Sequence, residues 1–538
     1  RIRGLNTIGA NSSPLVVIDG VIGATLENVD PNDLENVTVL KDASAAAIYG
    51  SRGSSGVILV TTKKGTPGRA QITYNGTLTQ SSILNQIDNM SPGEFIAAGG
   101  RDLGSQTDWL DAVTRDAITQ YHSLSASGGN GRSNYRVSAN IRENEGILEN
   151  SGFESFNTRL NFSTTALNDR LKIEFNSSFT QRDQENGWNE SMRYATLYNP
   201  TAPIYAVDSP YAFNGAQFGG YFETLGLFDS YNPVSIINQN LNNGERRTFN
   251  YGINLTYNLT SNITAYFTTA NQSNDYANRV YFRTTSLWNN NDGYGGADSP
   301  VRKGAAETYE QNSDFQLNEL YATWRKSNDN MNLSVTAGYS YQKENFNQVF
   351  FSLGDFPGDE IDYIDAIEYS QDLLNAGQIS AYSDRNPDTE IDAFFARLNL
   401  TLNNNIFINA SLRREGSTKL GADNRYGTFP SISLGADLAQ MLDLSGVQQL
   451  KPRISYGVTG NLPQGVGLAQ EIRGWSWGGS GSAGGSTNLL RAANPDLQWE
   501  EKSELNFGID LTMDRLSASL DIYQQETSNL ILNRVVDA

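Results

Sequence analysis

Residues 251–259 read YGINLTYNL, a stretch in which every second residue is apolar and the residues between are glycine, asparagine or threonine. Side chains of a β-strand point alternately to its two faces, so this stretch predicts a strand with one apolar and one polar face. Such a strand suits a membrane wall, where one face meets lipid and the other meets water.

The same two-residue alternation recurs along the chain after residue 69. It is found in residues 171–179, 333–341, 394–402, 505–511 and 516–522. Counting such segments gives about fifteen strands of roughly 10 to 15 residues, near the length that a tilted strand needs to cross a bilayer. The sequence therefore predicts a mostly β fold, a large antiparallel transmembrane β-barrel.

The connections between these strands alternate in length. Short turns are expected at 167–170, 260–261, 327–330, 403–404 and 513–514, and longer loops at 184–246, 275–313, 346–388, 416–428 and 460–496. Short turns on one rim and long loops on the other are typical of an outer-membrane barrel. Because an unpaired sheet edge is unfavourable in lipid, such a barrel closes, usually with an even strand count. We therefore expect further C-terminal sequence beyond this segment.

Composition argues against several other classes of protein. The chain has 538 residues, no cysteine, and a formal charge of −20 from 59 acidic and 39 basic residues. It can hold no disulfide and no thiolate metal site, and its acidity argues against a nucleic-acid partner. No apolar run reaches the roughly 18 residues of a transmembrane helix. Residues 1–4 do not resemble a signal peptide, so the start reads as internal.

Residues 1–65 follow a different pattern, that of a small, soluble α/β unit. The apolar run at 15–18 ends at Asp19 and Gly20, which suits a buried strand followed by a tight turn. Further strands are expected at 37–40 and 56–62. A barrel this wide would enclose a large aqueous lumen, and a unit of this kind could fill it.

Two short helices are expected within the same unit. Asp30 can cap the first, with Pro31 at its first position. Asp42 can cap the second, through residues 43–49, with Gly50 as a left-handed C-terminal residue.

Specific motifs resemble a known family. Residues 13–21 (SPLVVIDGV) and 30–53 (DPNDLENVTVLKDASAAAIYGSRG) closely resemble the plug of SusC/RagA-like TonB-dependent outer-membrane transporters. Segments similar to the barrel landmarks of that family occur at 107–109, 144–147, 424–431, 455–461 and 494–500. The resemblance spans nearly the whole chain, and its plug motif includes Asp19, Gly20, Lys41, Asp42, Tyr49, Gly50, Arg52 and Gly53.

The resemblance implies a barrel of about 22 strands with an internal plug, the plug lying in residues 1–65 and barrel strands in 66–538. It also implies three partners: a SusD-like surface lipoprotein, the TonB–ExbB–ExbD complex and outer-membrane lipid. The expected location is the outer membrane of a Gram-negative, Bacteroidota-like bacterium. The family's regulatory-like N-terminal domain, its TonB box, the start of its plug and roughly seven last strands have no counterpart, so we expect that this segment alone does not transport.

Several residues could in principle bind a ligand. Gly50, Gly53 and Gly56 follow a helix and lead into a strand, the reverse of a phosphate-binding loop, so a structural turn is favoured. Arg52 is expected to pair with a carboxylate of the plug or the wall rather than with substrate.

Aromatic residues in long loops are the candidates for substrate binding. Trp475 and Trp477 lie in the Gly/Ser-rich segment 474–485, and Trp288 lies near Tyr294. Indole and phenol rings stack on sugar rings, but they also anchor barrel rims in the lipid interface, and both alternatives stand. The pair Tyr211 and Phe213 carries the same ambiguity.

No cofactor is expected. An acidic loop could supply oxygen ligands for calcium, but it lacks the regular spacing of an EF-hand, so a solvated loop is favoured; its acids are Asp355, Asp359, Glu360, Asp362, Asp365 and Glu368. His122 is the single histidine and has no partners for a metal site or a triad. No nucleophile and base pair, zinc motif or hydrolase elbow is found, so the chain is predicted not to be an enzyme.

Three functions fit these patterns. The leading one is active import of a glycan or oligopeptide nutrient, powered by TonB. A passive porin would show the same barrel pattern but would not need the leading unit. A soluble glycan-binding adhesin would instead bury its apolar strand faces against a second sheet.

Overall fold

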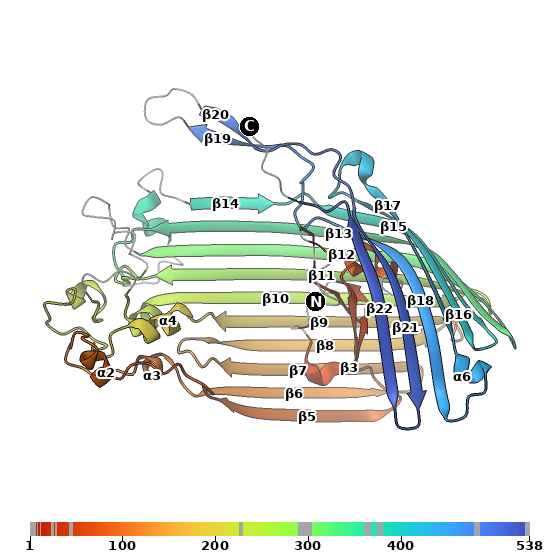
Figure 1. Ribbon diagram of the computed structural model, residues 1–538, viewed down its shortest axis with the longest axis horizontal. Coiled ribbons are helices and arrows are strands. Elements are labelled where there is room, and N and C mark those ends of the chain that lie inside the picture. The colour runs from red at the N-terminus through yellow and green to blue at the C-terminus, as the bar shows by residue number, and fades with distance from the viewer. Residues whose placement is uncertain are drawn as a thin grey trace.

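The computed structural model describes residues 7, 9–10, 12–22, 26, 29–41, 47–224, 230–288, 304–359, 367–373, 380–477 and 485–532. Most of them form one 16-stranded antiparallel sheet, the wall, which curves around a small four-stranded sheet (Figure 1). The wall strands are β5 (Gly68–Ser81), β6 (Ala117–Gly129), β7 (Ser133–Glu145), β8 (Gly152–Ala166), β9 (Leu171–Glu185), β10 (Asn240–Asn258), β11 (Ile263–Phe282), β12 (Ala305–Asn328), β13 (Met331–Gly354), β14 (Ser380–Arg385), β15 (Thr389–Leu402), β16 (Ile406–Ser417), β17 (Tyr426–Ala436), β18 (Val447–Asn461), β21 (Glu500–Met513) and β22 (Ser517–Ser528).

Wall strands pair in sequence order with two exceptions. The hairpin of β19 (Ile472–Trp477) and β20 (Gly485–Arg491) is a separate sheet between β18 and β21, and β14 pairs with β13 off the main path. Within the described residues, β5 and β22 are the edges of the wall and do not pair with each other. The predicted mostly β fold with a large antiparallel sheet is confirmed, and the wall is open in this part of the chain.

Apolar side chains form continuous rows on the convex face of the wall. One row runs across five strands, each member directly opposite the next: Leu255, Phe267, Leu320, Tyr339 and Phe394. Leu320 and Phe394 are 59% and 62% exposed. Residues of the opposite parity, such as Asn254 and Thr268, line a cavity on the concave side. The wall therefore has an apolar outer face and a polar inner face, as the alternation predicts.

Short turns and long loops lie on opposite rims of the wall, as predicted (Figure 1). Two strands run further than predicted. Strand β12 begins at Ala305 and β13 ends at Gly354, and both positions lie within stretches that the sequence predicted to be loops. Ala305 and Gly354 are still paired in register. Beyond the apolar rows both strand faces carry a mixture of polar and apolar residues, so the alternation fades while backbone pairing continues.

Helices α3 (Trp109–Val113), α4 (Glu190–Leu197) and α5 (Pro233–Gln239) pack together on the long-loop rim, in one cluster of buried residues that also includes Phe222. Helix α2 (Pro92–Ala97) precedes them in the chain and has no buried residue. Asp108 caps α3 by accepting from the N–H groups of Leu110 and Asp111, and Trp109 Nε1 donates to the Asn199 carbonyl at 3.0 Å. Residues 107–109, one of the segments that resemble the family's barrel motifs, thus connect to the loop that contains Asn199, which is far away in sequence.

The remaining helices of the described chain after residue 65 are short. They are α6 (Leu438–Met441) and the 3₁₀ turns η4 (Gly215–Gln217), η7 (Ile367–Tyr369), η8 (Gln371–Leu373) and η9 (Ala422–Asn424). In the described part of the chain, no helix has the length and apolar character needed to cross a membrane.

The small sheet contains β1 (Leu15–Ile18), β2 (Val21–Ile22), β3 (Leu34–Leu40) and β4 (Val57–Thr62) in the order β2-β1-β4-β3. Strands β1 and β4 are parallel, and the other neighbouring pairs are antiparallel. The predicted strands are confirmed. So is the turn after β1, where Asp19 and Gly20 both have positive φ.

Where they are described, the two predicted helices of this unit are 3₁₀ turns. In η2 (Pro31–Asp33) the Asp30 side chain accepts from Asn32 N at 2.7 Å, which confirms the predicted cap. For the second helix, residues 47–49 form a 3₁₀ turn rather than an α-helix, as the first part of η3 (Ala47–Gly53), and this turn breaks at Gly50, whose φ of 67° is positive as predicted and whose ψ is −152°. Asp42 lies outside the described residues.

A buried carboxyl lies within the long-loop helical unit. Glu223 is 1% exposed, and its Oε2 accepts from Asn232 N at 3.0 Å. Burial raises the pKa of Glu223 to about 7, although hydrogen bonds from Asn232 and Ser235 oppose the rise. Between pH 4.5 and about pH 7, the folded carboxyl keeps a proton that the unfolded carboxyl releases. The free energy of unfolding of this unit therefore falls as pH rises through that range.

We therefore expect the unit to open more easily at pH 8 than at pH 5.5, by about 1–2 kcal/mol from this group. Hydrogen exchange of the Phe222 and Asn232 amides, corrected for intrinsic rates, measures the opening free energy. Glu223→Gln should remove the difference, whereas Glu190→Gln, at an exposed carboxyl of α4, should retain it. Equal opening free energies at both pH values in the unsubstituted protein would contradict the assignment.

Candidate functional site

The small sheet packs against the concave face of the wall. Its apolar core, built around Val17 and Val57, continues into Ala270 of β11 and Phe315 and Leu317 of β12. Most other contacts between the two parts are polar. The predicted position of the leading unit, inside the curved sheet, is confirmed for the described residues (Figure 1).

The turn after β1 is held by an ion pair with the wall. Asp19 Oδ1 accepts from Thr62 N at 2.9 Å, and Oδ2 accepts from Thr62 Oγ1 at 2.6 Å. Arg159 of β8 lies 3.5 Å from Asp19 Oδ2, and the two side chains are 6% and 7% exposed. Asn161 Nδ2 donates to Thr62 Oγ1 and to the Lys63 carbonyl, both at 2.9 Å. This motif carboxylate thus ties β1 to β4 and both to the wall.

A second polar contact involves η2. Arg136 of β7 pairs with Asp33 at 2.8 Å, and Ser138 Oγ donates to the same carboxylate at 2.5 Å. Tyr121 of β6 donates to Asp30 through a short hydrogen bond. Strands β6 and β7 therefore bind the opposite end of the small sheet from η3.

A third contact centres on Glu415 of β16. Its Oε1 accepts from Ser51 Oγ at 2.5 Å and from Ser51 N at 3.3 Å, and its Oε2 accepts from Arg413 Nε at 2.5 Å. A Cβ on Gly50 would overlap Glu415 Oε2. Glycine is required at this position both by its backbone conformation and by the close approach of the wall.

Arg52 lies between the small sheet and the wall. Its guanidinium is 3.4 Å from Glu344 of β13 and lies over the Phe315 ring at 4.7 Å from the centroid. Burial lowers the pKa of Arg52, and the carboxylates of Glu344 and Glu415 oppose this change. The pairing with a wall carboxylate agrees with the contact predicted for this residue.

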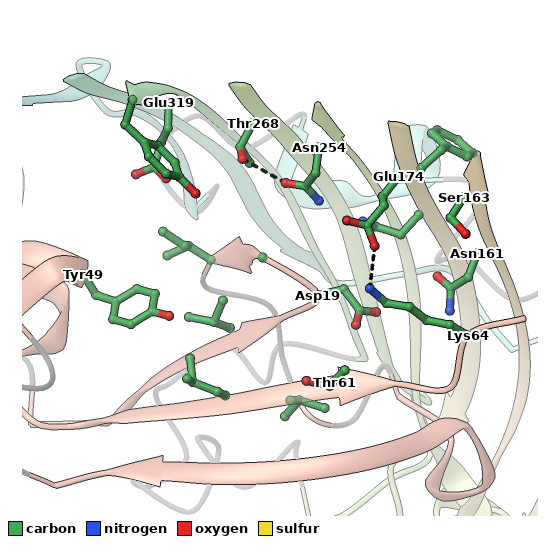
Figure 2. Close-up of a pocket in the computed structure, with 18 of the residues that line it drawn as sticks. Asp19, Tyr49, Thr61, Lys64, Asn161, Ser163, Glu174, Asn254, Thr268 and Glu319 are labelled. Carbon is green, nitrogen blue, oxygen red and sulfur yellow. Dashed lines mark hydrogen bonds and ion pairs between the residues drawn. The ribbon is translucent and has the colours of Figure 1, made fainter. Parts of the chain in front are cut away.

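One cavity lies between the small sheet and the wall near the short-turn rim. It has a volume of about 570 Å³ and is lined by Asp19, Tyr49, Lys64, Glu174 and Glu319, among others (Figure 2). Lys64 reaches across it to Glu174 at 2.8 Å. Burial lowers the pKa of Lys64, but the hydrogen bond to Glu174 and the negative charges of Glu174, Asp19 and Glu35 together outweigh burial and raise that pKa. Burial, reinforced by Glu319, raises the pKa of Tyr49.

A larger cavity lies toward the long-loop rim. It measures about 950 Å³ and is lined by Arg52, Arg246, Glu344, Lys419 and polar residues of β11 and β12. Burial lowers the pKa of Lys419, with a further contribution from Arg52. Ile22 of β2 lines both cavities. The hairpin of β1 and β2 is therefore part of the partition between them.

Family models match both parts of the chain. The model described as "TonB dependent receptor-like, beta-barrel" matches residues 198–538, and that described as "TonB-dependent Receptor Plug Domain" matches residues 1–57. This chain belongs to the TonB-dependent receptor family. Members of this family are outer-membrane β-barrel proteins, and the small sheet and the wall are named plug and barrel below.

Individual relatives agree with this membership. The receptor is similar to TonB-dependent receptor SusC of Bacteroides thetaiotaomicron, with 28% identity covering 99% of this chain and 55% of the relative. It is also similar to TonB-dependent receptor P3 of Formosa agariphila, with 29% identity covering 99% of this chain and 52% of the relative. The chain thus spans about half the length of these curated relatives. The structure of the RagAB peptide importer in the closed-closed state shares the fold, with a TM-score of 0.81, 22% identity, and coverage of 98% of this chain and 63% of that chain.

The other motif residues of the plug have simpler surroundings. Lys41 is exposed, and Gly53 is buried and accepts from Gly56 N at 2.9 Å. Sequence reasoning missed the barrel partners Arg136, Arg159 and Glu415. Their signal was a charged residue at a lumen-facing position of a barrel strand, but the sequence does not say which plug residue each one meets.

Some of the aromatic residues predicted to bind substrate pack against other side chains, and the others lie on β19 or outside the described residues. Trp288 is partly buried and packs edge-on against Trp188 at 4.9 Å, within a loop cluster, and Phe213 packs on Phe218 at 5.2 Å. Trp475 and Trp477 lie on β19, and Tyr294 lies outside the described residues. Tyr211 is covered by the Arg101 guanidinium at 4.0 Å. Substrate binding by these aromatic residues stays a prediction.

The acidic loop and the histidine make protein contacts where they are described. Asp359 accepts from Tyr281 OH, Thr284 N and Thr284 Oγ1 at 3.0, 2.8 and 2.6 Å, which fixes the loop to the end of β11. Asp355 and Glu368 are also described, whereas Glu360, Asp362 and Asp365 lie outside the described residues. His122 Nδ1 is 2.8 Å from Tyr74 OH of the neighbouring strand.

Breaking one plug–barrel ion pair should loosen the plug. Arg136→Leu leaves Asp33 buried without its cation, and removing one partner of a buried pair costs about 3–5 kcal/mol. Since 1.4 kcal/mol corresponds to a factor of ten, protease cleavage within residues 1–65 of the full-length receptor should accelerate at least about tenfold.

An exposed ion pair provides the matched control. Glu471→Gln breaks the ion pair between Glu471 and Arg473. The side chain of Arg473 is 54% exposed and that of Glu471 is 46% exposed. Exposed pairs contribute about 0–1 kcal/mol, so cleavage of the plug should change by less than about threefold. Similar rates for the two variants would show that the Arg136 contact does not hold the plug.

Proposed function

We propose that the full-length receptor imports a nutrient, a glycan or an oligopeptide, across the outer membrane, with energy supplied through TonB. The observation that supports this most directly is a plug held inside the barrel mainly by ion pairs and hydrogen bonds. Water can replace such contacts when the plug moves, whereas a large apolar interface would strongly oppose its displacement.

The two cavities provide a route for the ligand. The larger one opens on the long-loop side of the plug and the smaller one on the short-turn side, and Ile22 borders both. Displacement of the β1–β2 hairpin would join them. The hairpin is held by the contacts of Asp19 with Thr62 and Arg159, so these contacts form the latch in our proposal.

Partners follow from the same proposal. We infer that a SusD-like surface lipoprotein covers the long-loop rim, and that the TonB–ExbB–ExbD complex pulls on sequence preceding the plug. Similarity to SusC and the shared fold with the RagAB peptide importer support this arrangement and leave both glycan and peptide open as cargo. We also propose that the plug occupies residues 1–65, that barrel strands fill 66–538, and that the chain has no enzymatic role.

A reversible crosslink tests whether the plug must move. Thr62 in the plug and Asn161 in the barrel are joined by a 2.9 Å hydrogen bond, and this chain has no cysteine that could interfere. The probes are labelled oligomers that enter cells only when the receptor gene is present. In the full-length protein, the double substitution of Thr62→Cys and Asn161→Cys should abolish uptake of these oligomers. Reduction should restore it.

Each single cysteine variant serves as a control and should transport in both redox states. A passive porin predicts a different outcome, in which uptake continues in the oxidised double variant and resists a protonophore. Full uptake by the crosslinked protein would therefore reject gating by the plug.

A further inference from the structure

The connection between β18 and β21, residues 462–499, touches the plug directly. It carries the β19–β20 hairpin, a separate sheet that projects from the wall (Figure 1). At the base of this connection, Ala10 of the plug forms an antiparallel bridge with Pro463, and Gln464 Nε2 donates to the Ala10 carbonyl at 3.2 Å. Ala10 is 4% exposed. A loop of the long-loop rim is therefore joined to the part of the plug that precedes β1.

Glu500, the first residue of β21, holds the same part of the plug. Thr7 Oγ1 donates to Glu500 Oε2 at 3.1 Å and accepts from Ala10 N at 3.0 Å. Asn461 Nδ2 and Ile531 N also donate to this carboxyl, at 3.3 and 3.4 Å. Glu500 is 1% exposed, and a buried carboxyl is unfavourable unless donors surround it. Loss of the Thr7 hydroxyl would therefore disturb Glu500 and Asn461, the two residues between which the connection is suspended.

Hydrogen bonds join the hairpin to the base of the connection. Arg491, the last residue of β20, donates from Nη2 to the Gly467 carbonyl at 2.7 Å and from Nε to the Gln470 carbonyl at 3.2 Å. Asn494 N donates to the Ala469 carbonyl at 3.0 Å. These bonds link the two sides of the connection between the hairpin and Pro463. A displacement of the hairpin is therefore transmitted to the base.

The base itself is anchored on the loop between β16 and β17 and on the start of β17. The rings of Trp499 and Phe429 pack edge-on at 5.3 Å, within a buried apolar cluster. Lys419 Nζ donates to the carbonyls of Pro463 and Gln464, both at 3.4 Å. The anchor lies between the hairpin and the plug contact, so the hairpin moves about the anchor, and the contact with Ala10 lies on its other side.

The contact with the plug is small enough to open. Ala10 and Pro463 form a single bridge, whereas β1 and β4 pair over four residues. Ala10 precedes Leu15, the first residue of β1, by five residues, which span at most roughly 17 Å when fully extended. The β1–β2 hairpin therefore cannot leave the lumen while Ala10 stays on Pro463.

We propose that the connection of residues 462–499 is a coupling element, which retains the plug through Pro463 and Glu500 and loosens it when the β19–β20 hairpin is displaced. The inference deepens the proposed import function and rests on it, because release of Thr7 and Ala10 serves the displacement of the β1–β2 hairpin. The displacement comes from the lipoprotein that covers the long-loop rim in that proposal. Plug release is thereby made dependent on the state of the rim.

Coupling between two sites is reciprocal, so it can be measured from either end. At the hairpin end, Arg491→Gln frees the hairpin from the carbonyls of Gly467 and Gln470. Hydrogen exchange of the Ala10 amide, measured on the full-length receptor in detergent, should then accelerate at least about fivefold. The matched control is Arg473→Gln on the same hairpin, since Arg473 pairs with the exposed Glu471. This control should change the exchange less than about twofold.

At the plug end, Thr7→Val removes the hydroxyl that donates to Glu500. Exchange of the paired amides of β19 and β20 should accelerate at least about threefold. Thr38→Val is the control, because Thr38 lies on the exposed strand β3 and accepts from Asn36 at 3.2 Å. A purely structural Thr7 would loosen Ala10 and leave the hairpin unchanged.

Gln464→Ala gives a second measure of the same contact, since it removes one bond to Ala10 and leaves the hairpin intact. It should accelerate exchange both at Ala10 and in the hairpin. Unchanged Ala10 exchange in Arg491→Gln, or an unchanged hairpin in both Thr7→Val and Gln464→Ala, would overturn the proposal. These measurements need neither TonB nor transport, so a failure of the crosslinking experiment would refute import and leave the coupling intact. Absence of the coupling would leave import standing.

Discussion

Each barrel strand has to satisfy two environments at once, and the rest of the structure depends on this constraint. Because successive side chains point to opposite faces, residues such as Leu255 and Asn254 are forced apart, one to the convex face and one to the lumen. Backbone pairing then joins Leu255 to Phe267 and on to Leu320, so that an apolar outer surface arises from registration alone. The same registration places polar and charged residues around a single interior.

The polar interior determines how the plug is held. A large apolar plug surface would find few partners there, and the main apolar contact is the local one with Ala270, Phe315 and Leu317. Other contacts use buried charges, among them Asp19 with Arg159 and Asp33 with Arg136. Buried ion pairs add little net stability but strongly resist loss of one partner, so they fix position more than they add strength.

Local patterns in the sequence predicted much of the fold. Alternation gave the barrel strands, and the cap at Asp30 and the turn at Asp19 followed from residue type. Strand ends were missed where polar and apolar residues mix on both faces, as in the part of β12 that begins at Ala305. Partners such as Arg136 and Asp33, separated by 103 residues, could not be predicted, because only the register of distant strands brings them together.

In the import mechanism that we propose, the polar contacts of the plug would make its displacement reversible. When the β1–β2 hairpin leaves the barrel, Asp19 and Arg159 both exchange one partner for water, and little apolar surface is exposed except around Ala270 and Phe315. The hydrophobic effect then draws the plug back, while the ion pairs restore its register. The small apolar contact and the many polar ones thus have separate roles, the first in returning the plug and the second in setting where it stops.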